Sequence, residues 1–377
     1  MIASVQVLKQ FQDLGIDNAD ALNRLKLVID KVQEHNRLEG HTDSVSSVSV
    51  SPTENLIVSG SHDKTVKLWK LDGTLVKTMR HDAAVYSVNF SPDGQYIVSG
   101  GGDKKVKLWT KDGTFLDSVT EEKNIYFVNF SPDNKIISTG EDSTVRLWEY
   151  NSSKIIQKPY KTILGNGKYR VWSAEFSHNN SCKNIVTAGD DGNIRIFTKD
   201  STSVVTLRGH IAAATYASFG LNNKTVISSS YDSTIRMWQE NDNKTWSNVK
   251  TEKANNPYQV KFSPDYKTIA ATSIDGNIQL WKSNQLSQQY LIGRHRDKIT
   301  ALSFSNDSKW IVTASRDQIL RIWSLDSPSE NTSQTNTTNL LKKGCSWLSD
   351  YLNNNDKAHQ KYVDIRHICE NTKKYKI

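Results

Sequence analysis

The sequence has few cysteines and no long apolar run, and both absences limit what the chain can be. Its three cysteines, Cys182, Cys345 and Cys369, are scattered and do not make the framework of a disulfide-rich secreted domain. No stretch of about 18 apolar residues is present, so no transmembrane helix is expected. The first residues lack the charged start and apolar core of a signal peptide. We therefore expect a cytoplasmic protein that does not bind membranes.

The usual signatures of metal and nucleotide sites are also missing. Cys345, His359, His367 and Cys369 do not have the spacing of zinc ligands. Residues 190–193 resemble only a fragment of an EF-hand loop. The phosphate-binding pattern GxxxxGK followed by serine or threonine is absent. We expect no metal, no cofactor and no enzymatic activity in this chain.

The charge of the chain is positive but not concentrated. The 48 lysines and arginines and the 40 aspartates and glutamates give a formal net charge of +8. Basic residues are mixed with acidic ones throughout, and the densest basic group is Lys373, Lys374 and Lys376 at the end. Nucleic-acid binding through a basic surface is therefore an alternative function that we do not favour, and it predicts a clustered basic face.

An internal repeat dominates the sequence. Seven aspartates recur along the chain: Asp63, Asp103, Asp142, Asp191, Asp232, Asp275 and Asp317. An aromatic residue follows each of them after six positions: Trp69, Trp109, Trp148, Phe197, Trp238, Trp281 and Trp323. Successive aspartates are 40, 39, 49, 41, 43 and 42 residues apart. The chain therefore contains seven repeats, and the longer third interval predicts a loop insertion at about residues 151–167.

Each repeat reads as a group of short strands. Val48 and Val50, then Val66 and Leu68, alternate with polar residues, which is typical of half-buried strands. Residues 91–94, Ser-Pro-Asp-Gly, have the composition of a tight turn. These features resemble the WD-repeat family over about residues 35–325, which implies an all-β, seven-bladed β-propeller of four-stranded blades.

The two ends of the repeat region predict how the ring closes. The last repeat stops after its third strand, near Leu325, and a Ser/Asn/Thr-rich stretch follows. Residues 35–41 resemble the outer-strand ending at residues 205–210. We therefore expect residues 34–39 to complete the seventh blade and remove an open sheet edge. The expected organisation is a helical extension at 1–33, the propeller at 34–326, a linker at 327–338 and a helical segment at 339–377.

The flanks carry a second resemblance. Asn339–Leu352 is similar to the C-terminal part of large bacterial, chiefly cyanobacterial, signalling proteins in which a WD-repeat propeller follows a regulatory NTPase or another effector domain. Residues 34–41 resemble the start of their propeller. This resemblance implies an upstream effector or NTPase domain on another chain as a partner. The alternative is that both flanks are helical lids on the propeller.

Four repeats carry a histidine, a serine or threonine, an aspartate and a tryptophan at constant spacing. These sets are His41, Ser59, Asp63 and Trp69; His81, Ser99, Asp103 and Trp109; His210, Ser228, Asp232 and Trp238; and His295, Thr313, Asp317 and Trp323. A catalytic triad would occur once per active site, so four copies favour the buried structural tetrads that the resemblance implies. The remaining repeats depart from the set, with Glu121 in the third, Gly167 and Phe197 in the fourth, and Lys253 and Ala271 in the sixth. We expect those blades to be less firmly held together.

The family resemblance also implies a binding surface. In WD-repeat proteins such as the β subunit of heterotrimeric G proteins, partners dock on the top face, at positions three and five residues after the loop histidine and one before the turn aspartate. The corresponding positions here are Tyr86, Asn124, Tyr126, Glu141, Arg170, Trp172, Asp190, Tyr231, Asn256, Tyr258, Ile274, Lys298 and Arg316. Aromatic residues and arginine are typical of interface hot spots.

The sequence therefore predicts an interaction scaffold or sensor module of bacterial signalling that binds a protein or peptide of unidentified sequence on this face. Two alternatives stay open for the aromatic residues, which could instead plug the channel mouth or pack under a flanking helix. An enzyme with its site in the channel is a further alternative, which we favour least because no converging metal or cofactor ligands are recognisable.

Overall fold

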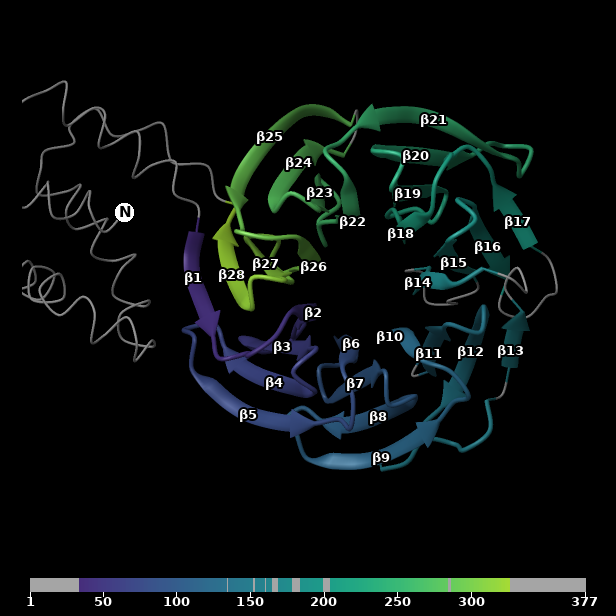
Figure 1. Cartoon of the computed structure of the whole chain (residues 1–377). Coiled ribbons are helices and arrows are strands. Elements are labelled where there is room, and N and C mark those ends of the chain that lie inside the picture. The colour runs from purple at the N-terminus through teal and green to yellow at the C-terminus, as the bar shows by residue number, and fades with distance from the viewer. Residues whose placement is uncertain are drawn as a thin grey trace, which may run out of the picture.

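The computed structural model describes residues 34–325 except 134, 152, 160, 165–168, 178–183, 199–203 and 284–285. The described residues form 28 strands in seven four-stranded antiparallel sheets, arranged as blades around one axis (Figure 1). The predicted all-β, seven-bladed propeller is confirmed. The predicted extension at 1–33, linker at 327–338 and segment at 339–377 lie outside the described residues.

The strands fall into four concentric sets. The innermost strands are β2 (Val45–Val50), β6 (Val85–Phe90), β10 (Ile125–Phe130), β14 (Val171–Phe176), β18 (Ala214–Phe219), β22 (Pro257–Phe262) and β26 (Ile299–Phe304). The second strands are β3 (Leu56–Ser61), β7 (Tyr96–Gly101), β11 (Lys135–Gly140), β15 (Asn184–Gly189), β19 (Thr225–Ser230), β23 (Thr268–Ser273) and β27 (Trp310–Ser315). The third strands are β4 (Thr65–Lys70), β8 (Lys105–Thr110), β12 (Thr144–Glu149), β16 (Ile194–Thr198), β20 (Thr234–Glu240), β24 (Asn277–Lys282) and β28 (Ile319–Ser324). The outermost strands are β5 (Leu75–Arg80), β9 (Phe115–Thr120), β13 (Lys161–Leu164), β17 (Val204–Leu207), β21 (Trp246–Lys253), β25 (Ser287–Arg294) and β1 (Glu34–Glu39).

The first two strands of blade two are connected by the tight turn that the sequence predicts. Between β6 and β7, the backbone N–H of Gly94 donates to the carbonyl of Ser91 at 2.8 Å. Gly94 has φ = 69°, a conformation that glycine adopts without steric cost. The Ser91 hydroxyl donates to the Asp93 carboxylate at 2.5 Å. The Ser-Pro-Asp-Gly sequence thus reverses the chain at the end of an innermost strand.

The hydrophobic core lies between the blades rather than inside one of them. One cluster joins Val58 and Leu68 of blade one to Val88, Ile97 and Trp109 of blade two, and all five side chains are buried. Neither face of a four-stranded sheet is covered by its own blade, so each blade contributes one apolar face to each neighbour. The ring is therefore stable as a unit, because every blade completes the core of the next.

The ring closes in the seventh blade through the first described strand. β1 pairs antiparallel with β28, placing Leu38 opposite Leu320, and the two strands lie side by side in Figure 1. Leu38 is fully buried in a cluster that also contains Val45 of blade one and Ile322 of blade seven. The predicted strand exchange is confirmed, and it seals the edge that β28 would otherwise expose.

The predicted insertion of the third repeat also has a clear place. Of the predicted range 151–167, the part before residue 161 connects β12 to β13 in blade three, residues 161–164 form β13, and residues 152, 160 and 165–167 lie outside the described residues. Ile155 of this connection is 2% exposed and packs in the core between blades two and three. Its backbone N–H donates to the carboxylate of Asp117 in β9 at 2.9 Å, so the longer loop folds back onto the preceding blade.

Candidate partner-binding site at the channel mouth

The four predicted tetrads come together as hydrogen-bonded sets. In blade two, the Nδ1 and Nε2 atoms of His81 lie 2.9 Å from the Asp103 carboxylate and 2.7 Å from the Ser99 hydroxyl. The indole N–H of Trp109 donates to the same hydroxyl at 2.8 Å. Matching bonds occur in the other three sets, in blades one, five and seven. Each set ties the loop before a blade to two of its strands.

Burial prevents these sets from acting as nucleophilic triads. Burial lowers the pKa of His81, although the hydrogen bond and charge of Asp103 oppose that effect, so the ring is neutral and donates through Nδ1. Its Nε2 then accepts from the Ser99 hydroxyl. Ser99 is fully buried and its oxygen already accepts from Trp109. A substrate cannot reach this hydroxyl, so the contacts satisfy buried polar groups.

The blades that depart from the set differ from one another. In blade three, Glu121 accepts from the hydroxyl of Ser138 and pairs with Arg146 at 2.8 Å. Trp148 still donates to Ser138 at 2.8 Å. Contrary to our expectation for this blade, Glu121 thus makes the contact that histidine makes elsewhere. An ion pair compensates the buried carboxylate.

Blades four and six keep less of the pattern. In blade four, Asp191 pairs with Arg195 at 2.6 Å, and Phe197 has no N–H to donate. Gly167 lies outside the described residues. In blade six, Lys253 is exposed and Ala271 has no hydroxyl, so no tetrad forms among the described residues of that blade.

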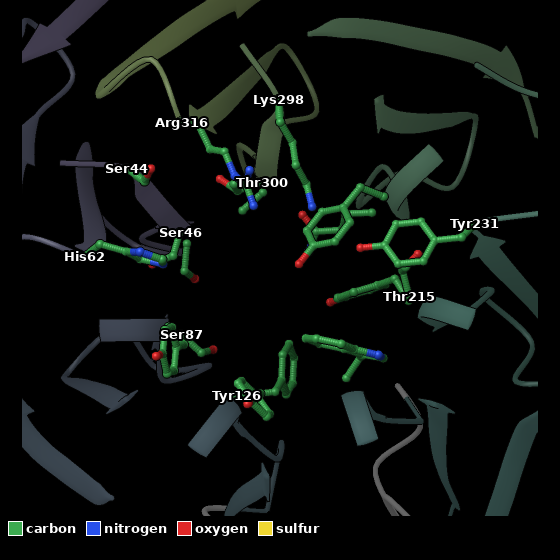
Figure 2. A pocket seen from close by; sticks show the side chains of 18 residues that line it. Ser44, Ser46, His62, Ser87, Tyr126, Thr215, Tyr231, Lys298, Thr300 and Arg316 are labelled. Atoms are coloured by element: carbon green, nitrogen blue, oxygen red, sulfur yellow. The ribbon is translucent and has the colours of Figure 1, made fainter. Parts of the chain in front are cut away.

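A cavity of about 270 Å³ opens where the channel meets the face that carries these loops. Seven of the thirteen predicted partner-binding residues line it: Tyr86, Tyr126, Trp172, Tyr231, Tyr258, Lys298 and Arg316. Figure 2 shows Tyr126, Tyr231, Lys298 and Arg316 arranged around one opening. The predicted residues that do not line this cavity are Asn124, Glu141, Arg170, Asp190, Asn256 and Ile274. We call the cavity and its lining residues the channel mouth.

A β-bulge recurs at the same place in all seven blades and decides which side chains enter the channel mouth. In β2, Val45 pairs with Ser61 and Ser47 pairs with Gly60, so Ser46 is the extra residue. The other six innermost strands shift register between their first and third residues in the same way. A bulge releases its extra residue from the ladder and redirects its side chain. The seven residues all line the cavity, namely Ser46, Tyr86, Tyr126, Trp172, Thr215, Tyr258 and Thr300.

The aromatic rings of the channel mouth form two groups. Tyr126 lies 5.4 Å from Tyr86 and 5.3 Å from Trp172, measured between ring centroids. The indole N–H of Trp172 donates to the Asp190 carboxylate at 2.5 Å, which holds that ring in place. Across the opening, Tyr231 and Tyr258 stack with their centroids 6.3 Å apart. Such offset arrangements are the ones that aromatic pairs favour.

Two cations complete the channel mouth from blade seven. The ammonium of Lys298 lies 3.3 Å from the centroid of Tyr258, a cation–π contact. Burial, reinforced by the charge of Arg316, lowers the pKa of Lys298 to about 8, although Asp297 opposes that shift. Neither Lys298 nor Arg316 makes an ion pair within the part of the chain that the structure describes. Their charges are therefore available to an anionic group on a partner.

Sequence reasoning omitted several residues of the same surface. Ser44, Ser46, His62, Thr215 and Thr300 also line the cavity. They occupy the same offsets from the loop histidine and turn aspartate as the predicted residues, so the repeat spacing itself could have identified them.

The floor of the channel mouth was not foreseen. It is formed by Phe127 and Tyr216, which line the cavity and meet with centroids 6.0 Å apart. These residues belong to blades three and five, so their contact spans blade four, which lies between them.

The described residues can be examined for clusters of metal ligands and for membrane-spanning helices. Within the described ranges, no group of three or more histidine, cysteine, aspartate or glutamate residues is placed to hold a metal ion. No helix in that part of the chain is long and apolar enough to cross a membrane.

Comparison with known families agrees with this architecture. The family model described as the first β-propeller of IFT122 matches residues 21–255. The model of the WD domain, G-beta repeat, matches residues 247–282 and 286–324. The chain belongs to the WD-repeat β-propeller family. WD-repeat propellers are typical protein-interaction scaffolds, and the present chain has the architecture of one.

Individual relatives of this WD-repeat propeller match over short segments. A rice (Oryza sativa subsp. japonica) protein named as a homolog of the ribosome biogenesis protein WDR12 is 54% identical over 37 residues, which is 10% of this chain and 8% of the relative. A Drosophila melanogaster homolog of the ribosome biogenesis protein BOP1 is 52% identical over 44 residues, 11% of this chain and 6% of the relative. The WD repeat-containing protein slr0143 of Synechocystis is 42% identical over 53 residues, 14% of this chain and 4% of the relative. The chain thus matches less than a tenth of the length of these relatives.

Proposed function

We propose that this propeller is a scaffold that binds an acidic peptide segment of a partner protein at the channel mouth. The observation that carries the proposal is the composition of one cavity. Blades two to six each contribute at least one aromatic ring, and blade seven contributes Lys298 and Arg316. Rings give a partner much contact area at a low entropic cost, and the cations select for acidic side chains.

The two sides of the channel mouth suggest how such a peptide lies. Trp172 and Tyr126 form an apolar wall on blades three and four, where Asp190 accepts from the indole. Lys298 and Arg316 face them from blade seven (Figure 2). A peptide with an apolar or aromatic side chain next to an acidic one would place the first on the indole and the second on the cations.

Substitutions on both sides of the opening test the proposal. We expect Trp172→Ala and Arg316→Ala each to weaken binding of an acidic peptide, selected by display on the wild-type chain, by about 1–3 kcal/mol. Phe115→Ala and Arg208→Ala are matched controls, because both residues are exposed on the circumference of the ring. Affinity is measured by fluorescence polarisation beside a thermal melt of each variant. Unchanged affinity in both test variants, with binding mapped to the blade sides, would remove the channel mouth as the site.

Nucleic-acid binding is the second candidate, because aromatic rings beside cations can also stack and hold bases. The arrangement of charge favours a peptide instead. Exposed lysines lie next to acids, as in the pairs Lys105–Asp82 at 2.9 Å and Lys250–Glu252 at 3.0 Å. Asp190 lies at the rim of the opening itself. A single-stranded oligonucleotide that bound with a steep salt dependence, and more tightly than acidic peptides, would reverse this preference.

The biological setting of the scaffold is a further part of the proposal. We infer a role in bacterial signalling, supported by the similarity of residues 34–41 and 339–352 to signalling proteins that join a propeller to an NTPase or effector domain. Ribosome biogenesis, which two of the similar proteins are named for, is not extended to this chain, because each match covers about one repeat. Co-purification of the tagged chain with an NTPase from the source cell supports the signalling role, and co-purification with ribosomal precursors refutes it.

A further inference from the structure

A second cavity, of about 430 Å³, occupies the opposite end of the channel. Its walls are the last two residues of the innermost strands and the turns that follow them, whereas the channel mouth is built from the first three residues of these strands. All innermost strands occupy equivalent places in the ring, so the two cavities lie at opposite ends of the axis. Phe127 and Tyr216, which contact each other, line the first cavity and not the second.

The polar part of this cavity is a ring made by the fifth residue of every innermost strand. Six of the seven are hydrogen-bonded within the wall, either to backbone groups of the next blade, to their own strand or to each other: Ser49, Asn89, Asn129, Glu175, Ser218 and Ser303. In particular, the Ser218 hydroxyl donates to the Glu175 carboxylate at 2.9 Å. These bonds leave the seventh member, Lys261, as the exception.

The ammonium of Lys261 makes no hydrogen bond or ion pair with any residue in the described part of the chain. The ammonium nitrogen lies 5.5 Å from the centroid of the Tyr216 ring. Burial lowers the pKa of Lys261, while the charge of Glu175 opposes that shift. A cation in a cavity whose wall offers it no acceptor is a site where an anionic group would be stabilised.

Most of the other lining residues of the cavity are apolar. Five phenylalanines at the ends of the innermost strands surround the polar ring, namely Phe130, Phe176, Phe219, Phe262 and Phe304. An apolar wall with a few converging polar groups is the usual form of a small-molecule pocket, and the volume lies in the range such pockets have. A peptide backbone would find few partners here, because most polar side chains of the ring are already hydrogen-bonded within the wall.

We propose that this cavity binds a small apolar carboxylic acid that also carries a hydrogen-bond donor. The carboxylate pairs with the ammonium of Lys261, the apolar body packs on the phenylalanines, and the donor faces the carboxylate of Glu175. The proposal is independent of the function assigned to the channel mouth, because Lys261, Glu175 and the phenylalanines do not line that opening.

Three related probes test the chemistry with the full chain. L-phenylalanine carries the carboxylate, the apolar ring and the ammonium; 3-phenylpropanoate lacks the ammonium, and phenethylamine lacks the carboxylate. Binding is followed by ligand-observed NMR and calorimetry at neutral pH. We expect L-phenylalanine to bind with saturation at millimolar or lower concentration, 3-phenylpropanoate to bind more weakly and phenethylamine not to bind.

Substitution of the cation locates the site. Lys261→Met keeps the length of the side chain and removes its charge, and it should weaken L-phenylalanine binding about tenfold or more. Lys261→Arg retains the charge and should retain binding, which separates loss of the charge from loss of the fold. Lys267→Met is the matched control in the same blade, because this lysine is exposed, with 83% of its side chain accessible.

The outcomes divide cleanly. Loss of binding in Lys261→Met with retention in Lys261→Arg and Lys267→Met supports the site. Saturable binding that is unchanged in Lys261→Met, binding of phenethylamine as tight as that of L-phenylalanine, or no saturable binding of any probe would each overturn the proposal. Acidic-peptide binding at the channel mouth, measured on the same variants, should be unaffected, so failure of one site does not imply failure of the other.

Discussion

Asp103 allows the sharpest test of the tetrads, because its charged carboxylate is both buried and hydrogen-bonded. Its carboxylate accepts from His81 Nδ1 at 2.9 Å and from the backbone N–H groups of Asp82 and Lys105 at 3.3 and 3.2 Å. The side chain is 3% exposed. Burial raises the pKa of Asp103, but the hydrogen bonds from His81 and the two backbone donors outweigh burial and lower the pKa from 3.8 to about 2.

Replacing this residue by asparagine keeps its shape and removes its charge. In Asp103→Asn, the amide nitrogen must replace either Oδ2, which accepts from His81 and the Asp82 N–H, or Oδ1, which accepts from the Lys105 N–H, so at least one donor loses its acceptor. A lost charged hydrogen bond together with an unsatisfied donor is expected to lower the free energy of unfolding by about 2–4 kcal/mol at pH 7. The fall in pKa from 3.8 to about 2 corresponds to about 2 kcal/mol of that difference.

The part of this stability difference that comes from the carboxylate charge must vary with pH in a defined direction. The pKa of Asp103 is lower in the folded than in the unfolded state, so its contribution is complete above about pH 5 and is lost as the pH falls toward 2. About half of the charge contribution should be gone at pH 3. The difference in stability between wild type and Asp103→Asn should therefore shrink between pH 7 and pH 3.

Urea unfolding followed by tryptophan fluorescence measures this difference at each pH. Asp82→Asn is the matched control in the same blade, because Asp82 is an exposed acid paired with Lys105 at 2.9 Å, and its loss should change stability little. Equal stability of Asp103→Asn and wild type at pH 7 would refute the tetrad interpretation. A large stability difference at pH 7 that stays the same at pH 3 would refute the inference that the carboxylate charge of Asp103 provides part of the stabilisation.

Three other outcomes are expected. Leu38→Ala in the closing strand should lower the free energy of unfolding by about 2–5 kcal/mol in urea titrations, because Leu38 is fully buried between blades seven and one; a cost below about 1 kcal/mol would show that β1 is not needed for closure. Gly293→Ala should lower the melting temperature, because an added Cβ would lie 2.0 Å from the ring of Trp323; an unchanged melt would contradict that packing. Burial and the charge of Arg316 lower the pKa of Lys298 to about 8, so affinity for an acidic peptide in fluorescence polarisation should fall from pH 7 to pH 9, whereas Lys298→Arg should show no such fall.

Most of the architecture followed from the sequence because a propeller repeats one local pattern. The seven aspartate–aromatic pairs predicted seven blades, and the truncated last repeat predicted that residues 34–39 pair with β28, as they do. Among the channel-mouth residues, Tyr86 was reached by counting from the loop histidine, and Tyr126 and Trp172 from the register of the apolar strand in their blades. Constant offsets work here because every blade places equivalent residues at equivalent distances from the axis.

Contacts between distant blades were decided only by the tertiary structure. The bulge that redirects Tyr126 depends on how β10 pairs with β11, and the strand pattern alone does not show one extra residue. The contact of Phe127 with Tyr216 spans two blades that are not neighbours, so no repeat offset predicts it. The isolated ammonium of Lys261 likewise depends on which side chains the ring brings together at its axis. Repeat spacing determines the position of a residue within its blade, whereas closure of the ring determines which residues of other blades its side chain contacts.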